Sequence, residues 1–148
     1  MTATPTATAL PAVRQAARSN EVSRKALWTG RILTGLSTAF FLLDGAMKLA
    51  KPPVVVEGTV RLGYPESTIV GIGVALLICT LLYLIPRTSV LGAILLTGYL
   101  GGAVASNLRA QQPMFNLVFP VIIAAIAWSG LWLRDTRLQQ LAPLRKEA

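Results

Sequence analysis

Three long uncharged stretches of mostly apolar residues fill the second half of the chain. They cover residues 67–85, 88–108 and 114–133, which are 19, 21 and 20 residues long. At a helical rise of about 1.5 Å per residue, each is roughly 28–32 Å long, which matches the hydrocarbon core of a bilayer. A fourth apolar stretch, residues 27–48, carries charges only near its two ends. The pattern therefore predicts four membrane-spanning helices.

The segment between the first two predicted spans, residues 52–66, fits two interpretations. Pro53 suits the first turn of a helix, Val56 and Val60 recur at helical spacing, and Gly63 suits a C-terminal cap. The consecutive valines at 54–56 favour an extended segment instead, and Gly58 weakens a helix. We favour a short helix that lies at the membrane interface.

The connections and flanks complete an all-α fold, an integral membrane four-helix bundle over residues 27–133. Only Pro86 and Arg87 join the second and third spans, so these helices are predicted to be antiparallel neighbours. Residues 1–26 are basic and of low complexity. We expect a disordered cytoplasmic tail there, although a composition poor in acids also resembles a transit peptide. Residues 134–148 are predicted to form an amphipathic basic tail on the membrane surface.

The lysine and arginine residues predict the orientation of the bundle. With four spans, both termini lie on the same side of the membrane. That side receives ten lysine and arginine residues, and the opposite side receives four. Because basic residues concentrate on the cytoplasmic side, both termini are predicted to be cytoplasmic.

Composition supports a membrane protein and excludes several kinds of chemistry. Charged residues make up 14% of the chain, against about 25% in soluble domains. The net charge of +8 lies mainly beside the apolar stretches, so we expect a lipid bilayer and no nucleic acid as partner. The chain has no histidine and one cysteine, Cys79. Histidine-bound metals, Ser–His or Cys–His catalysis and an intrachain disulfide are therefore excluded. We expect no metal, no resident cofactor and no enzymatic activity.

Asp44 and Lys48 are the first candidates for a polar site, because they stand four residues apart near the end of the first span. A carboxylate at that depth needs a partner, a polar interior or a proton. One interpretation is a local ion pair that ends the helix, which we favour slightly. The other is a site that binds a polar headgroup or relays protons. Asn107 and Arg109 end the third span on the same side and are its candidate neighbours.

Small residues recur every four positions in the third span, at Gly98, Gly102 and Ser106. Such a face allows two helices to approach closely. We therefore predict that these residues pack against a neighbouring helix, and a ligand site is the less favoured alternative.

Several motifs, in order along most of the chain, resemble the DoxX-like family of the wider DoxX/DoxD superfamily. They are Asp44-Gly45-Ala46-Met47-Lys48, Leu62-Gly63-Tyr64-Pro65, Ile85-Pro86-Arg87-Thr88, Thr97-Gly98-Tyr99-Leu100-Gly101-Gly102-Ala103 and Trp128-Ser129-Gly130-Leu131-Trp132. The resemblance implies a bacterial, multi-pass inner-membrane protein with four helices. It also implies an association with a terminal quinol oxidase, for which the superfamily is named. In similar sequences the position of Asn107 is often histidine, and asparagine cannot titrate.

Three functions fit these observations. We favour a non-catalytic subunit, scaffold or assembly partner, acting with another membrane protein or as a homo-oligomer. The resemblance supports a redox subunit associated with a quinone or an oxidase, but no residue of the chain supplies redox chemistry. The third function is a small transporter with a polar site at Asp44 and Lys48.

Overall fold

The computed structural model describes residues 24–135 and 138–139, and it is helical almost throughout. The predictions for residues 1–23, 136–137 and 140–148 lie outside the described residues. The elements in chain order are α2 (Arg24–Ala50), α3 (Pro53–Arg61), the short 3₁₀ helix η1 (Glu66–Thr68), α4 (Ile69–Leu84), α5 (Ser89–Arg109) and α6 (Met114–Arg134).

Four of these helices are long and apolar enough to cross a membrane: α2, α4 together with η1, α5 and α6. Their ends lie within three residues of the four predicted spans. Helix α2 begins at Arg24. The helix therefore includes the last three residues of the predicted N-terminal tail. The apolar stretches thus predicted the number and placement of the long helices.

The segment between α2 and α4 forms a helix, α3, with the predicted signals at both ends. Pro53 is the first helical residue, where its missing N–H costs nothing. Gly63 has φ +84°, and its N–H donates to the Val60 carbonyl while the Tyr64 N–H donates to the Thr59 carbonyl. These bonds form a Schellman cap, and a glycine suits its left-handed position.

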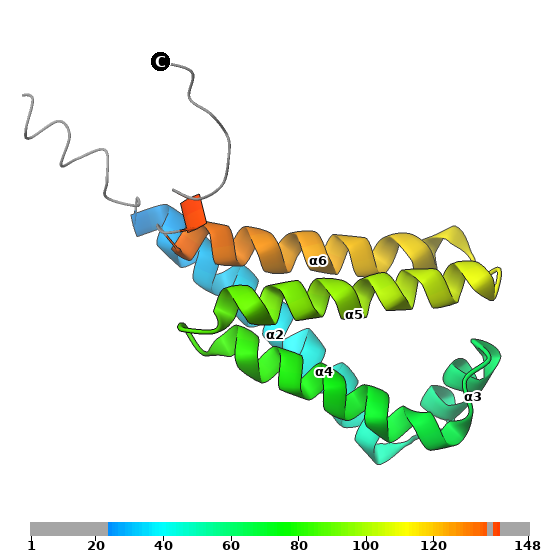
Figure 1. Ribbon diagram of the computed structural model, residues 1–148. Coiled ribbons are helices and arrows are strands. Elements are labelled where there is room, and N and C mark those ends of the chain that lie inside the picture. The colour runs from blue at the N-terminus through cyan, green and yellow to red at the C-terminus, as the bar shows by residue number, and fades with distance from the viewer. Residues whose placement is uncertain (1–23, 136–137, 140–148) are drawn as a thin grey trace, which may run out of the picture.

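Each long helix packs against two others, in the ring order α2, α4, α5, α6 (Figure 1). Short connections join α4 to α5 and α5 to α6, and the longer segment that holds α3 joins α2 to α4. Consecutive long helices are antiparallel, and α6 returns beside α2. Many large apolar side chains on these helices are exposed, among them Ile32, Leu43, Ile78, Ile94 and Val121. An outer surface of this kind suits the hydrocarbon of a bilayer.

The end of the bundle that holds the α4–α5 turn, here called the closed half, is tightly packed. Helices α2 and α6 touch at Gly30 and Gly130, where a Cβ on Gly130 would lie 2.8 Å from the Thr34 backbone nitrogen. Tyr83 is fully buried, and its hydroxyl donates to the Ala127 carbonyl at 2.8 Å. Leu96 and Leu131 belong to the same buried cluster. The core of the protein therefore lies mainly in this half.

The opposite end, which holds α3 and is here called the open half, is arranged differently. Helices α2 and α4 stay together at Gly45 and Gly73, where a Cβ on Gly73 would lie 2.8 Å from the Lys48 Cβ. Helices α5 and α6 run side by side along their length (Figure 1). The two helix pairs diverge toward this end, and α3 lies at the end of the α2–α4 pair. The two helix pairs thus pack together in the closed half and separate in the open half.

Candidate functional site

A pocket of about 580 Å³ lies in the open half between the two helix pairs. Its walls come from α2, α3, α4, α5 and α6, and most of the side chains in them are apolar. Pockets of about 300–1,000 Å³ with apolar walls and a few polar groups are typical small-molecule sites. The pocket is therefore the candidate functional site of the protein.

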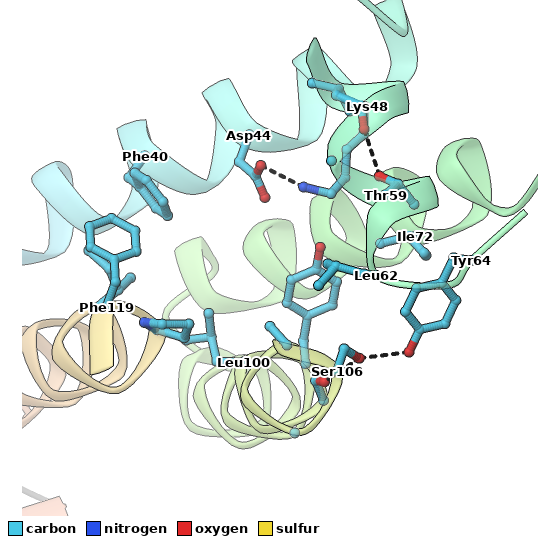
Figure 2. A pocket seen from close by; sticks show the side chains of 18 of the residues that line it. Phe40, Asp44, Lys48, Thr59, Leu62, Tyr64, Ile72, Leu100, Ser106 and Phe119 are labelled. Atoms are coloured by element: carbon cyan, nitrogen blue, oxygen red, sulfur yellow. Dashed lines mark hydrogen bonds and ion pairs between the residues drawn. The ribbon is translucent and has the colours of Figure 1, made fainter. Parts of the chain in front are cut away.

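Asp44 and Lys48 both line this pocket, and they form an ion pair. The Lys48 Nζ donates to the Asp44 Oδ1 at 2.5 Å, and the two side chains point toward each other along one face of α2 (Figure 2). The side chain of Lys48 is 18% exposed and that of Asp44 is 35% exposed. Because the acid precedes the base by four residues, the helix itself positions the pair. The pair brings two opposite charges into the pocket, which cancel.

Apolar and aromatic side chains line the end of the pocket nearer the closed half. Phe40 lies one helical turn from Asp44, and its ring packs edge-on against Phe119 of α6 at 5.4 Å between centroids. Ile123, one turn further along α6, also lines this end. Figure 2 shows Phe40 and Phe119 facing each other, away from the ion pair. The pocket is therefore apolar and aromatic at this end, and its charged and hydroxyl side chains lie toward the other end, beside Val54, Val55 and Leu62.

The segment between α3 and η1 borders the polar end and is bound to α5. The Tyr64 hydroxyl lies 2.7 Å from the Ser106 hydroxyl, which also bonds the Gly102 carbonyl (Figure 2). Since Ser106 has one proton and donates it to Gly102, Tyr64 is the donor to Ser106. The Arg109 guanidinium donates to the Leu62 carbonyl at 2.8 Å and lies over the Tyr64 ring. These contacts bind residues 62–64, here called the α3 segment, to α5 beside the pocket.

The chain matches the family model described as the DoxX-like family over residues 32–130. It belongs to the DoxX-like family. This match covers most of the membrane-spanning helices and the whole pocket region. No curated protein and no solved structure matches the chain. With its four apolar helices, this DoxX-like chain is a multi-pass membrane protein, and its activity has to be inferred from the site.

The structure places the four predicted polar-site residues of this DoxX-like protein in three settings. Asp44 and Lys48 meet in the pocket wall. Arg109 lies nearby but binds the Leu62 carbonyl instead of the ion pair. Asn107 donates to the Ala103 carbonyl of its own helix, 2.8 Å away. The structure therefore brings the first two together, gives Arg109 a role in holding the α3 segment, and leaves Asn107 outside the pocket wall.

The small-residue face of α5 lies in the pocket wall, where the sequence predicted a contact with another helix. Gly98, Gly102 and Ser106 all line the pocket. A Cβ on Gly98 or Gly102 would meet no heavy atom within 4 Å. Small residues leave space beside a helix, and here that space forms part of a cavity.

The sequence analysis identified only some of the pocket residues, and those it missed include Thr59, Tyr64, Tyr99 and Phe119. Tyr64 and Tyr99 stand within motifs of the family resemblance, which was the available signal. Tyr99 lines the same pocket as Asp44, and among the described residues its hydroxyl makes no hydrogen bond. The described residues also contain no cluster of three or more His, Cys, Asp or Glu side chains that would hold a metal.

Proposed function

We propose that this DoxX-like protein is a non-catalytic component of the bilayer that binds a small apolar or amphipathic molecule in the pocket of its open half. The single observation that carries the proposal is a pocket of about 580 Å³ with largely apolar walls and one internal ion pair. Binding such a ligand needs no nucleophile, metal or general base. The protein would therefore act as a scaffold or assembly partner and not as an enzyme.

The orientation of the protein is part of this proposal. The excess of lysine and arginine on the side of the termini favours cytoplasmic termini in an inner membrane. The pocket and α3 would then lie at the opposite, non-cytoplasmic interface. Reporter fusions at both termini test this orientation, and active cytoplasmic reporters at both ends are expected. A C-terminal reporter that is active only outside the cytoplasm would contradict it.

Native mass spectrometry of the protein released from lipid nanodiscs tests ligand binding. We expect one bound molecule per chain in the wild type and a large loss of this species in Gly102→Leu. Leucine at that position projects into the pocket, and nothing within 4 Å opposes its Cβ.

Gly101→Leu is the matched control, because Gly101 has the same open surroundings but does not line the pocket. The control variant should keep the bound molecule. Equal loading of the wild type and both variants would show that the molecule binds elsewhere. A wild type without any bound molecule would also contradict the proposal.

A second function, transport of a small solute, is favoured by the position of the ion pair in an opening between two helix pairs. Substrate sites of transporters lie within the membrane between groups of helices. Solute flux into liposomes that contain the purified protein, and that disappears in Asp44→Asn, would establish this function. A bound quinone in the mass spectrum would instead favour the redox-associated alternative.

A further inference from the structure

Three features of the pocket together limit the chemistry of its ligand. Its two charged side chains cancel, its polar side chains gather toward one end, and it has hydrogen-bond donors that the protein does not use. The inference drawn from them rests on the proposed function, since it names the class of molecule that this pocket takes.

The charge in the pocket is balanced before any ligand enters. Asp44 and Lys48 are the two charged side chains in its wall, and they bind each other at 2.5 Å. A carboxylate ligand brings one negative charge beyond this balanced pair, and a cationic ligand brings one positive charge, whether or not the pair opens to receive it. Either ligand leaves one unbalanced charge in largely apolar surroundings, which is costly. A head without net charge avoids this cost.

The polar groups are gathered at one end of the pocket. Lys48, Tyr64 and Ser106 lie toward the α3 end, whereas Phe40, Phe119 and Ile123 lie toward the closed half. Along α2 the order is Phe40, Asp44, Lys48, with one helical turn, about 6 Å, between neighbours. This direction matches a molecule with one polar end and one hydrocarbon end.

Hydrogen-bonding groups remain available at the polar end. Tyr99 lines the pocket near Asp44, and its hydroxyl makes no hydrogen bond within the described part of the chain. The Lys48 ammonium has three protons and uses one for Asp44. These donors suit a carbonyl or hydroxyl oxygen. The second oxygen of Asp44 suits a hydroxyl proton.

We propose that the pocket binds an uncharged single-chain amphiphile, such as a glycerol ester or long-chain alcohol from the bilayer, with its oxygens beside Tyr99 and the Asp44–Lys48 pair and its chain beside Phe40 and Phe119. The pocket volume of about 580 Å³ is enough for one hydrocarbon chain and a small head group. A phospholipid with two chains is too large for this volume. The exposed apolar surface of the helices places the protein where such molecules dissolve.

Photolabelling in phosphatidylcholine nanodiscs tests this proposal. Three probes share one dodecyl chain that carries a diazirine, and their heads are a glycerol ester, a carboxylate and a trimethylammonium. Peptide mapping reports the labelling of α2 and α6 in the pocket. We expect the glycerol ester to label the wild type at least about tenfold more than either charged probe, because an unpaired charge in the membrane is costly.

Two substitutions of the ion pair should change this preference in opposite directions. Asp44→Asn leaves Lys48 unpaired and should raise labelling by the carboxylate probe. Lys48→Met leaves Asp44 unpaired and should raise labelling by the trimethylammonium probe. A single symmetric peak in size-exclusion chromatography and an unchanged helical circular dichroism spectrum show that each variant is folded. A folded Asp44→Asn variant without any gain for the carboxylate probe would overturn the assigned role of the pair.

Filling the pocket separates this inference from the proposed function. Gly98→Leu should abolish labelling by the glycerol ester, whereas Gly101→Leu should leave it unchanged. If a charged probe labels the wild type best and Gly98→Leu abolishes that labelling, the neutral-head inference is wrong and the pocket is still a ligand site. If Gly98→Leu changes no labelling, both the inference and the proposed function fail.

Discussion

Two glycines on α5, Gly92 and Gly98, stand six residues apart and have opposite surroundings. In the closed half, a Cβ on Gly92 would collide with the backbone of Tyr83. In the open half, a Cβ on Gly98 would enter the pocket and meet no heavy atom within 4 Å. The comparison shows that a small residue in a membrane helix allows either a close helix contact or a cavity. Which of the two it allows depends on the neighbouring helices.

The largest difference between the halves is expected when these two glycines are replaced by alanine. Gly92→Ala forces α4 and α5 apart and should abolish the folded protein. Gly98→Ala should be neutral or stabilise the fold by up to about 1 kcal/mol, because alanine favours a helix more than glycine does. Folded yield and unfolding in mixed micelles measure both effects. Equal tolerance of the two substitutions would contradict the assignment of a closed half.

A second pair of substitutions compares the halves on α6. Leu131 is fully buried in the closed half, and Leu131→Ala should lower the free energy of unfolding by about 2–5 kcal/mol. Ile123 borders the pocket, so Ile123→Ala enlarges an existing space and should cost less than half as much. Titration with a denaturing detergent measures both. Similar losses would mean that the open half is packed as tightly as the closed half.

Removal of single hydroxyl groups should give a smaller contrast. Tyr83→Phe deletes a buried hydrogen bond to Ala127 and should cost about 1 kcal/mol. Tyr64→Phe deletes the bond to Ser106, but Ser106 keeps its bond to Gly102 and Tyr64 is only half-buried. Its cost should therefore be smaller. The same unfolding titration compares the loss of unfolding free energy in the two variants. A larger loss in Tyr64→Phe would mean that the more stabilising hydroxyl lies in the open half.

The smallest expected effect is confined to residues 62–64, which directly follow α3. Arg109→Gln removes the bond to the Leu62 carbonyl and the contact with the Tyr64 ring. Amide hydrogen exchange of residues 62–64 should become several-fold faster, while global unfolding stays nearly unchanged. Arg87→Gln removes a charge from the α4–α5 turn and is the control. Unchanged exchange in Arg109→Gln would mean that Arg109 does not hold the segment.

The sequence predicted where the helices begin and end better than it predicted which helix faces pack together and which line the pocket. Long uncharged stretches determine the span boundaries, because bilayer thickness fixes how many apolar residues a helix needs. The helix α3 could also be predicted, because Pro53 and Gly63 determine where it begins and ends without any contact to another helix. The pairing of Asp44 with Lys48 was also predictable, because four residues separate them on one helix.

The remaining site residues depend on contacts between helices, which no local pattern contains. Tyr64 meets Ser106 across 42 positions of sequence, and Arg109 meets Leu62 across 47. Gly98 and Gly102 have the spacing of a helix-packing face, yet they line the pocket because the α2–α4 pair diverges from α5. That divergence follows from the glycine contacts Gly30–Gly130 and Gly45–Gly73 at opposite ends of α2.

An electron-density map of the wild-type protein crystallised from phosphatidylcholine bicelles tests the open half and its ligand most directly. We expect α2 and α4 to stand apart from α5 and α6 in this half. We also expect elongated density that runs from the Asp44–Lys48 pair to Phe40 and Phe119. Helix pairs packed together in this half, with Phe40 or Asp44 against Gly98 and no space between them, would contradict both expectations.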